Sequence, residues 1–238
     1  GCRMIYAVSD IHGCYSQYKE VLEKIQFSDE DTLYVLGDVL DRGPDGFRVL
    51  ADMAGRYNVI PLIGNHEYMA LSVLKPLMTE ITEDNYDKIL DRDFMERYQY
   101  WISDGGQITL EQFRKLGMED REFYLEYLEE FQLYEEFTLN GDRYVLVHAD
   151  LAGDRKDRPL EEYGIEQMIF SRAEYDRKYS DSYYLVTGHT PTFRMGSEYD
   201  GKIYKKNHHI AIDCGCVSGR RLGVYCFDTG ECFYSSDY

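Results

Sequence analysis

The stretch of sequence that decides the fold is Gly37-Asp38-Val39-Leu40-Asp41-Arg42-Gly43. It directly follows the apolar run Leu33–Leu36, which has the length of a buried strand. A second polar motif, Gly64-Asn65-His66-Glu67, follows the apolar run Val59–Ile63 in the same manner. Because ligands of open α/β sheets collect where parallel strands end, we expect the two motifs to lie side by side at one edge of a sheet.

The N-terminal segment supplies a third unit of this kind. Asp10-Ile11-His12-Gly13 follows the apolar run Ile5–Val8, and Tyr15–Phe27 then carries apolar residues at helical spacing. Another helical segment follows Pro44, a residue that suits the first turn of a helix. Strands and helices therefore alternate, which predicts a mostly parallel, buried sheet.

Residues 68–140 have a different pattern, with few strand-like runs and many helix formers and aromatic residues. The segments Phe94–Ile102 and Glu119–Phe137 are predicted helices, and Ser103-Asp104-Gly105-Gly106 marks a break between them. We interpret 68–140 as a mostly helical insertion within a single domain that covers residues 1–238.

The strand pattern returns after this insertion. Two more polar motifs, His148-Ala149-Asp150 and Gly188-His189-Thr190, follow apolar runs there. Glycines punctuate the last hairpins, so we expect a second, more antiparallel sheet packed on the first. The predicted fold class is therefore α/β, a two-sheet sandwich with a helical insertion. The strands expected in this part are Tyr144–Val147, Tyr184–Thr187, His209–Ile212 and Leu222–Phe227.

The five motifs bring carboxylates, imidazoles and one amide to strand ends. A pair of cations about 3.5–4 Å apart can hydrolyse phosphate esters, and it needs a carboxylate able to bridge both ions. Asp38 is the best bridging candidate, because it ends the central strand of the first three. The mixed donors suit Mn²⁺, with Fe²⁺ or Zn²⁺ as alternatives, better than Ca²⁺. The other expected ligands are Asp10 and His12 on one ion, and Asn65, His148 and His189 on the other.

Three further residues fit the reaction. Arg42 lies in a turn where a guanidinium can hold phosphate oxygens in a bidentate manner, or else pair with Asp41 or Asp45. His66 follows the expected ligand Asn65, so its own side chain should point elsewhere and could protonate the leaving oxygen. Asp41 is the carboxylate expected to orient His66. The two remaining histidines, His208 and His209, do not share the strand-end placement and are interpreted as structural.

This set of motifs resembles the phosphoprotein phosphatase branch of the metallophosphoesterases, whose pattern is GDxHG, GDxxDRG, GNHE, HAG or HGG, and GHT. The motifs occur in that order over residues 9–190, and Trp101–Thr109 is similar to the WxxNGGxxT segment of small bacterial members. The resemblance implies an αβ-sandwich, two transition-metal ions, and the ligand, clamp and acid roles given above. It also implies a second phosphate-binding arginine, which Arg172 in Phe170-Ser171-Arg172 matches loosely.

Two positions depart from the family pattern. Ser9 replaces the first glycine of GDxHG, where another small residue should be harmless. Asp150 replaces the glycine of HAG and adds a negative charge near the expected phosphate path. Two alternatives stay open for Asp150: it lowers the affinity for phosphate, or it holds a metal ligand in place from behind.

The resemblance leaves three functions open. The first is a dinuclear-metal phosphomonoesterase that removes phosphate from phosphoserine and phosphothreonine in proteins, with phosphotyrosine as a further class, through attack by a metal-held hydroxide. The second is a hydrolase of nucleotides like the bis(5'-nucleosyl)-tetraphosphatases, which share the core. The third is a regulatory member without catalysis, which the complete ligand set argues against. The expected partner is thus a phosphoprotein or a small phosphorylated substrate.

Composition narrows the classes of function. The net charge of −18 argues against a nucleic-acid partner, because phosphate backbones attract basic surfaces. The apolar run Met4–Val8 is too short for a membrane span or a signal-peptide core, so we expect a cytoplasmic protein without a membrane partner. The scattered cysteines are expected to be reduced, mostly core thiols. They are Cys2, Cys14, Cys214, Cys216, Cys226 and Cys232.

Overall fold

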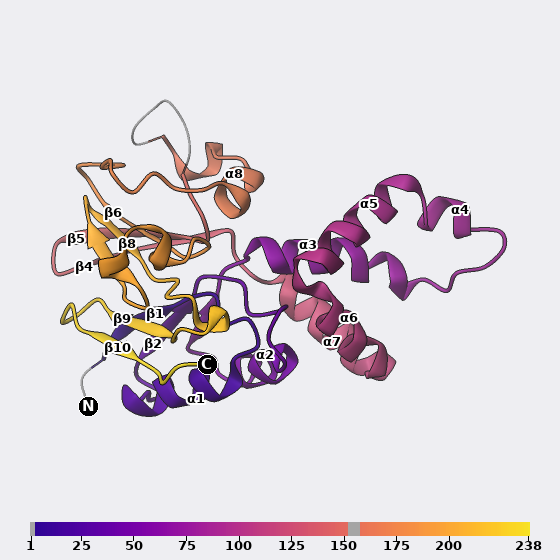
Figure 1. Ribbon diagram of the computed structural model, residues 1–238, viewed down its shortest axis with the longest axis horizontal. Coiled ribbons are helices and arrows are strands. Elements are labelled where there is room, and N and C mark those ends of the chain that lie inside the picture. The colour runs from indigo at the N-terminus through magenta and orange to yellow at the C-terminus, as the bar shows by residue number, and fades with distance from the viewer. Residues whose placement is uncertain (1–2, 152–157) are drawn as a thin grey trace.

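The computed structural model describes residues 3–151 and 158–238. Two β-sheets lie face to face, helices cover their outer faces, and a further group of helices projects to one side (Figure 1). Among the described residues, no helix combines the length and the apolar character needed to cross a bilayer.

The first sheet has the strand order β10-β9-β1-β2-β3. The strands β1 (Ile5–Val8), β2 (Thr32–Val35) and β3 (Val59–Pro61) run parallel, as predicted. The strands β9 (Gly223–Cys226) and β10 (Cys232–Tyr234) extend the sheet on the other side of β1 as an antiparallel hairpin. The C-terminal hairpin therefore completes the N-terminal sheet.

The second sheet has the strand order β4-β5-β6-β8-β7. Its centre is parallel, with β5 (Asp142–Val147), β6 (Tyr184–Thr187) and β8 (His209–Ala211) side by side. The outer strands β4 (Tyr134–Leu139) and β7 (Tyr204–Lys206) pair antiparallel. The expected second sheet is thus present, and it is mixed.

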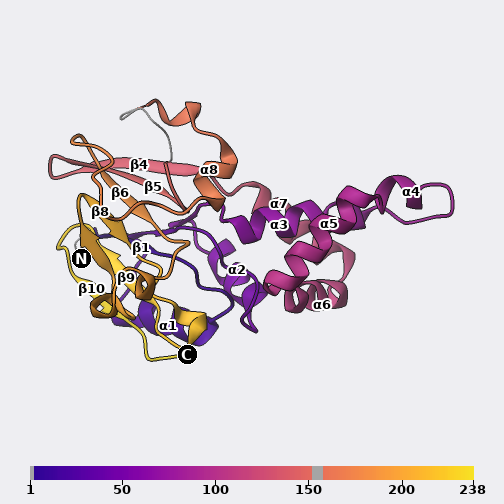
Figure 2. The same ribbon diagram turned by 45° about the horizontal axis from the view of Figure 1, so that its top comes forward.

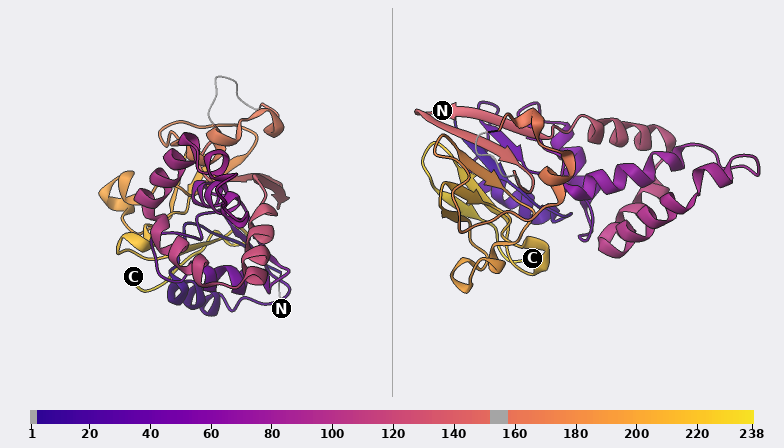
Figure 3. Two further views of the ribbon diagram at one scale, coloured as in Figure 1. Left: turned by 90° about the vertical axis from the view of Figure 1, so that its right-hand side faces the viewer. Right: turned by 90° about the horizontal axis from the view of Figure 1, so that it is seen from above.

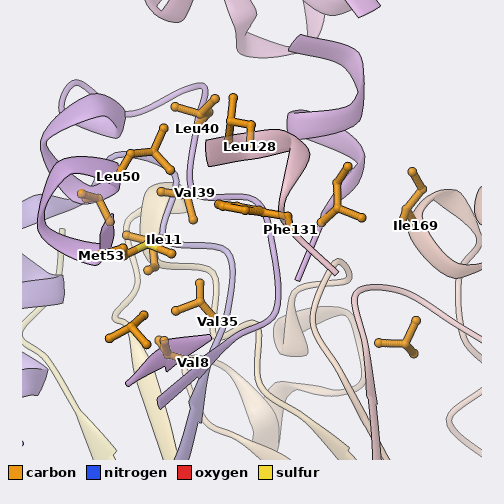
Figure 4. Close-up of a cluster of buried hydrophobic side chains, with 14 of the residues drawn as sticks. Val8, Ile11, Val35, Val39, Leu40, Leu50, Met53, Leu128, Phe131 and Ile169 are labelled. Atoms are coloured by element: carbon orange, nitrogen blue, oxygen red, sulfur yellow. The ribbon is translucent and has the colours of Figure 1, made fainter. Parts of the chain in front are cut away.

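Side chains of successive strand residues alternate between the two faces of each sheet. Ala7 and Tyr34 pack between the sheets, whereas Val8 and Val35 face the helices α1 (Tyr15–Lys24) and α2 (Gly46–Ala54) on the outer face. Figure 4 shows Val8 and Val35 in one buried cluster with Leu50 and Met53 of α2. The helix α8 (Ile165–Phe170) packs into the same cluster through Met168 and Ile169.

The projecting helices form an arm, which we define as residues 86–129, with α3 as its root (Figures 2 and 3). At its base, Leu128 and Phe131 reach the loop residues Val39 and Leu40 (Figure 4). The helices are α3 (Asn65–Leu74), α4 (Tyr86–Ile89), α5 (Arg92–Trp101), α6 (Gln107–Lys115) and α7 (Met118–Glu129). The short turns of helix are η1 (Pro76–Met78), η2 (Ile102–Gly106), η3 (Leu160–Glu162), η4 (Thr192–Arg194), η5 (Ser197–Tyr199) and η6 (Cys216–Ser218).

The predicted helix Glu119–Phe137 is wrong at its C-terminal end. The helix α7 stops at Glu129, and the chain enters β4 at Tyr134. Pairing with β5 along its whole length decides the structure of this segment, because tertiary contacts override a modest helical preference. The helices of this part therefore span Asn65–Glu129 rather than the whole of 68–140.

Candidate metal centre and its pocket

The residues predicted as metal ligands converge where β1, β2, β5 and β6 end and where α3 begins. Four of them have a left-handed backbone: φ is 53° at Asp10, 42° at His12, 57° at Asp38 and 68° at His189. A non-glycine residue in this conformation carries strain, and such residues cluster at functional sites. The chain therefore accepts an unfavourable backbone to aim these side chains inward.

His12 approaches two carboxylates on one side of the centre. Its Nε2 lies 3.6 Å from Asp10 Oδ1 and 3.6 Å from Asp38 Oδ2. Its other ring nitrogen, Nδ1, donates to the carbonyl oxygen of Leu40 at 2.8 Å, so Nε2 is the ring atom that can bind a cation once it has lost its proton. Asp10, His12 and Asp38 can thus hold one cation together.

Asn65 gathers the second group of ligands. The end of its amide that faces the centre lies 3.0 Å from His148 Nε2, 3.1 Å from Asp38 Oδ2 and 3.2 Å from His189 Nδ1. With the amide oxygen in this place, lone pairs of four side chains meet and no hydrogen lies between them, which a cation satisfies. With the amide turned over, its NH₂ group donates to the same atoms. The mixed oxygen and nitrogen ligand atoms at this point therefore fit a divalent transition metal.

The charges at the centre support this fit. Burial lowers the pKa of His12, but the hydrogen bond and charge of Asp10 and the charge of Asp38 outweigh it and raise the pKa to about 10. Burial also lowers the pKa of His148, and Asp38 again raises it to about 10. His12 and His148 thus keep their protons because the neighbouring carboxylates favour positive charge. Bound cations would supply the same positive charge in place of these protons. Burial lowers the pKa of His189 to about 4, so this ring is neutral and ready to bind a metal.

Asp38 belongs to both possible metal-binding groups found among the described residues. One group joins Asp38 with His148 and His189, and the other joins it with His12 and His66. This shared position fits the bridging role predicted for Asp38. Within the second group, His66 has only Nε2 available, because its Nδ1 is bonded to Asp41.

Glu67 is a residue of the site to which the sequence alone assigned no role. Its buried carboxylate accepts hydrogen bonds from the backbone N–H groups of Asp38, Val39, Leu40 and Gly64, at 2.6–3.2 Å. Burial, and next the charge of Asp38, raise the pKa of Glu67 to about 7. Glu67 therefore ties the loop after β2 to the start of α3, and it fixes where Asp38 lies relative to Asn65.

The structure brings together the two residues predicted as the acid dyad. His66 Nδ1 lies 2.7 Å from Asp41 Oδ2. The same oxygen accepts the indole N–H of Trp101 at 2.7 Å, and Asp41 Oδ1 accepts the hydroxyl of Thr109 at 2.6 Å. All four side chains are buried. The carboxylate thus takes part in three hydrogen bonds inside the protein, and His66 Nε2 is the end of the dyad that faces the pocket.

Both predicted arginines line the pocket above the ligands, together with Asp10, Asp38, Asn65, His66 and His189. Arg42 pairs neither with Asp41 nor with Asp45, the two alternatives from the sequence. Its Nη2 instead lies 3.1 Å from Asp104 Oδ1. Arg172 lines the same pocket after α8. Both guanidinium groups therefore lie at the pocket above the metal ligands, and that of Arg42 is partly occupied by Asp104.

Two further residues near the centre were not predicted from the sequence. Arg194 of η4 lines the pocket as a third arginine. Asp213 is buried at the end of β8, where it accepts the backbone N–H of Gly215 at 3.0 Å. Burial and then the charge of Asp10 hold the pKa of Asp213 well above its usual range. Asp213 follows an apolar run, as the other motifs do, so the same pattern could have identified it.

Several residues noted in the sequence lie away from the pocket. Asp150 Oδ1 accepts the hydroxyl of Tyr179 at 2.6 Å and the backbone N–H of Leu151 at 2.8 Å. Its carboxylate therefore points into the protein rather than into the phosphate path. His209 bonds Thr187, and His208 stacks on Tyr184, which agrees with structural roles for both. The described cysteines are free: Cys14, Cys214, Cys216 and Cys226 are buried, Cys232 is exposed, and Cys2 lies outside the described residues.

Comparison with known families agrees with this geometry. Residues 4–212 match the family model of the calcineurin-like phosphoesterases. The chain belongs to this family. Calcineurin-like phosphoesterases are metal-dependent hydrolases, so the family supports the metal centre built from the strand ends.

The curated relatives of this chain include symmetrical bis(5'-nucleosyl)-tetraphosphatases. The symmetrical bis(5'-nucleosyl)-tetraphosphatase of Erwinia tasmaniensis is 32% identical over 115 residues, which are 48% of this chain and 42% of that protein. The corresponding enzyme of Proteus mirabilis is 24% identical over 179 residues, 72% of this chain and 66% of that protein. The chain thus matches about half of the length of such relatives.

Solved structures show the same fold at low identity. A crystal structure assigned to a diadenosine tetraphosphatase has a TM-score of 0.68 at 19% identity, over 99% of this chain and 94% of that one. A serine/threonine phosphatase from Saccharomyces cerevisiae has a TM-score of 0.58 at 15% identity, over 99% of this chain and 80% of that one. These likenesses establish the two-sheet phosphoesterase fold and leave the substrate open.

Proposed function

We propose that this chain hydrolyses phosphoric esters at a centre of two divalent transition-metal ions. The observation that carries the proposal is that His148 Nε2, His189 Nδ1 and both carboxylate oxygens of Asp38 lie within 3.0–3.2 Å of one atom of the Asn65 amide. On the other side of Asp38, His12 and Asp10 complete the set. Mn²⁺ is the proposed metal, with Fe²⁺ or Zn²⁺ as alternatives.

The residues around that centre have separate roles in the proposed reaction. When bound, the cations lower the pKa of water and neutralise phosphoryl oxygens. Arg42 and Arg172 hold the phosphoryl oxygens and orient the group for attack. His66 Nε2 donates a proton to the leaving oxygen, and Asp41 keeps the proton on Nδ1 and holds the ring in place.

Dinucleoside tetraphosphates are the substrate class that the curated relatives favour. They are the substrates named for the Erwinia and Proteus enzymes, and they support this alternative better than the phosphoprotein expected first from the sequence. A pocket with the three arginines Arg42, Arg172 and Arg194 also suits a chain of several phosphates.

Phosphomonoesters of serine and threonine are the second candidate class, and the acid dyad favours them. An alkoxide is a poor leaving group and needs the proton that His66 can donate, whereas a nucleoside diphosphate leaves as a stable anion. The hydrogen bonds of Trp101 and Thr109 to Asp41 hold the dyad ready for this task. Neither a nucleic acid nor a membrane is needed as partner in either case.

Purified protein loaded with Mn²⁺ tests the proposal. We expect two equivalents of metal by elemental analysis, turnover of a phosphoserine peptide or of diadenosine tetraphosphate, and loss of turnover after chelation. The Asp38→Asn variant is the matched control, because it keeps the shape of the side chain and removes the bridging charge. Turnover that survives both metal removal and Asp38→Asn would falsify the two-metal proposal.

A further inference from the structure

One charged side chain in the pocket has no role in the chemistry described so far. Asp104 lies in η2, the kink between α5 and α6, and it lines the pocket beside Arg42 and His66. Its side chain is 34% exposed, so it reaches the pocket without being freely solvated.

The backbone fixes Asp104 in this place. Gly105 has φ 108°, and its carbonyl oxygen accepts the backbone N–H of Arg42 at 2.9 Å. A Cβ atom at Gly105 would lie 2.4 Å from Arg42 Cγ, so the kink and the Arg42 turn fit closely against each other. Asp104 is therefore held by two loops that are far apart in the sequence.

The carboxylate of Asp104 lies between the predicted phosphate clamp and the predicted acid. Its Oδ1 is 3.1 Å from Arg42 Nη2, and its Oδ2 is 3.5 Å from His66 Nε2. The backbone oxygen of Asp104 accepts a third contact, from Arg42 Nε at 3.4 Å. The leaving oxygen of a substrate must approach His66 Nε2, so the group attached to that oxygen must pass close to Asp104.

We propose that Asp104 is a specificity-determining residue that disfavours anionic leaving groups and favours neutral or cationic ones. This inference rests on the proposed phosphoester hydrolysis and deepens it. In either reaction the bond between phosphorus and the leaving oxygen breaks, water supplies the new oxygen, and His66 supplies a proton to the leaving oxygen where one is needed. The two substrate classes differ in the charge carried by the leaving group.

That difference decides the expected selectivity. In a phosphoserine peptide the leaving group is the serine side chain, which departs as an uncharged alcohol. Basic residues beside that serine would be attracted by Asp104. In a dinucleoside tetraphosphate that is cut symmetrically, the leaving group is a nucleoside diphosphate. Its negative charges would lie close to the carboxylate of Asp104 and be repelled by it. Asp104 also occupies one guanidinium nitrogen of Arg42, which a polyphosphate would otherwise recruit.

The test compares Asp104→Asn with wild type on both substrate classes. Asparagine keeps the size and an oxygen that can accept from Arg42, but it removes the charge. We expect kcat/KM for diadenosine tetraphosphate, divided by kcat/KM for a phosphoserine peptide with basic neighbours, to rise about tenfold. The matched control is Asp93→Asn, which breaks an ion pair with Arg97 on the surface of α5 and should leave the ratio unchanged.

A binding measurement separates charge from a general disturbance of the pocket. Calorimetry should show tighter binding of inorganic tripolyphosphate to Asp104→Asn than to wild type, with a smaller change for inorganic phosphate. An unchanged ratio of kcat/KM together with unchanged tripolyphosphate binding overturns the inference and leaves phosphoester hydrolysis standing. Absence of turnover on both substrates by metal-loaded wild type overturns the proposed function instead.

Discussion

The strand-end loops and the helical arm build one pocket in different ways. The loops supply the metal ligands from residues that directly follow their own strands, and they do so with a buried, left-handed backbone at Asp10, His12 and Asp38. The arm supplies Trp101, Asp104 and Thr109 from helices whose outer faces carry exposed ion pairs.

This difference separates two functions. The loops supply the side chains that would bind the cations, and the arm supplies side chains that contact Asp41 and His66. A family can therefore keep its metal centre and change its substrates by changing the arm. Substitutions in the loops should alter metal content, and substitutions in the arm should alter substrate preference with the metal content unchanged.

The largest effect is expected from Asp38→Asn. The Asp38 side chain lies in both ligand groups. Loss of its charge should therefore weaken the binding of both cations and lower kcat by about a thousandfold or more. Elemental analysis and calorimetric titration with Mn²⁺ measure the binding. Asp10→Asn is the control and should weaken the binding of one cation only. Equally mild effects of both substitutions would contradict the bridging role of Asp38.

The next largest effect is expected from His66→Asn, at the boundary between the loops and the arm. General acid catalysis is worth about 10²–10⁴-fold, so turnover of phosphoserine peptides should fall by that factor. Para-nitrophenyl phosphate releases a stable phenolate and should be affected much less. The metal content should not change. If the metals are lost, or if both substrates slow equally, His66 is a ligand or a structural residue.

The sequence predicted the loops better than the arm for a physical reason. Asp10, Asp38 and His148 each follow an apolar strand, so a local pattern predicts where each of them lies. Trp101 and Thr109 reach Asp41 from 60 and 68 residues away, and no local pattern encodes such contacts. The resemblance to a known segment marked these residues without assigning their contacts.

The fold follows the same division. The strands β1 and β6 have the predicted boundaries, because buried apolar runs leave little choice. The strand β4 was predicted as the end of a helix, since its exposed and half-buried residues do not alternate clearly between apolar and polar. It pairs with β5 across the two-residue turn Asn140-Gly141, where both residues have positive φ. Asn-Gly between two strands is a strong hairpin signal, so the sequence did contain the information that ends the helix before β4.

A smaller effect is expected from Trp101→Phe in the arm. The Trp101 ring packs against Gly106, and a phenylalanine ring can keep part of this packing. The hydrogen bond from the indole N–H to Asp41 is lost. A hydrogen bond to a charged group is worth roughly 1.5–3 kcal/mol, so kcat on phosphoserine peptides should fall at least about tenfold. Metal content and turnover of para-nitrophenyl phosphate should stay near wild type. A loss that is equal on both substrates would mean that Trp101 supports folding rather than the acid.

The smallest effect on activity is expected at His209, on β8 of the sandwich. Its ring is fully buried, Nε2 lies 2.7 Å from Thr187 Oγ1, and burial lowers its pKa to about 3. In the unfolded chain the ring takes up a proton below about pH 6.5, but in the folded chain it stays neutral. The unfolded state therefore binds more protons as the pH falls from about 6.5 toward 3, and stability is lost over that window.

Between pH 7 and pH 5 this residue should lower the free energy of unfolding by about 2 kcal/mol. Urea denaturation of His209→Gln at the two pH values should show a drop smaller than that of wild type by this amount, although the variant is less stable at both. His208→Gln, which removes the neighbouring histidine stacked on Tyr184, is the comparison variant. The arm contributes nothing to this difference, because residues 86–129 contain no histidine. An unchanged drop in His209→Gln would place the acid sensitivity elsewhere, in the carboxylates or in the ligand histidines.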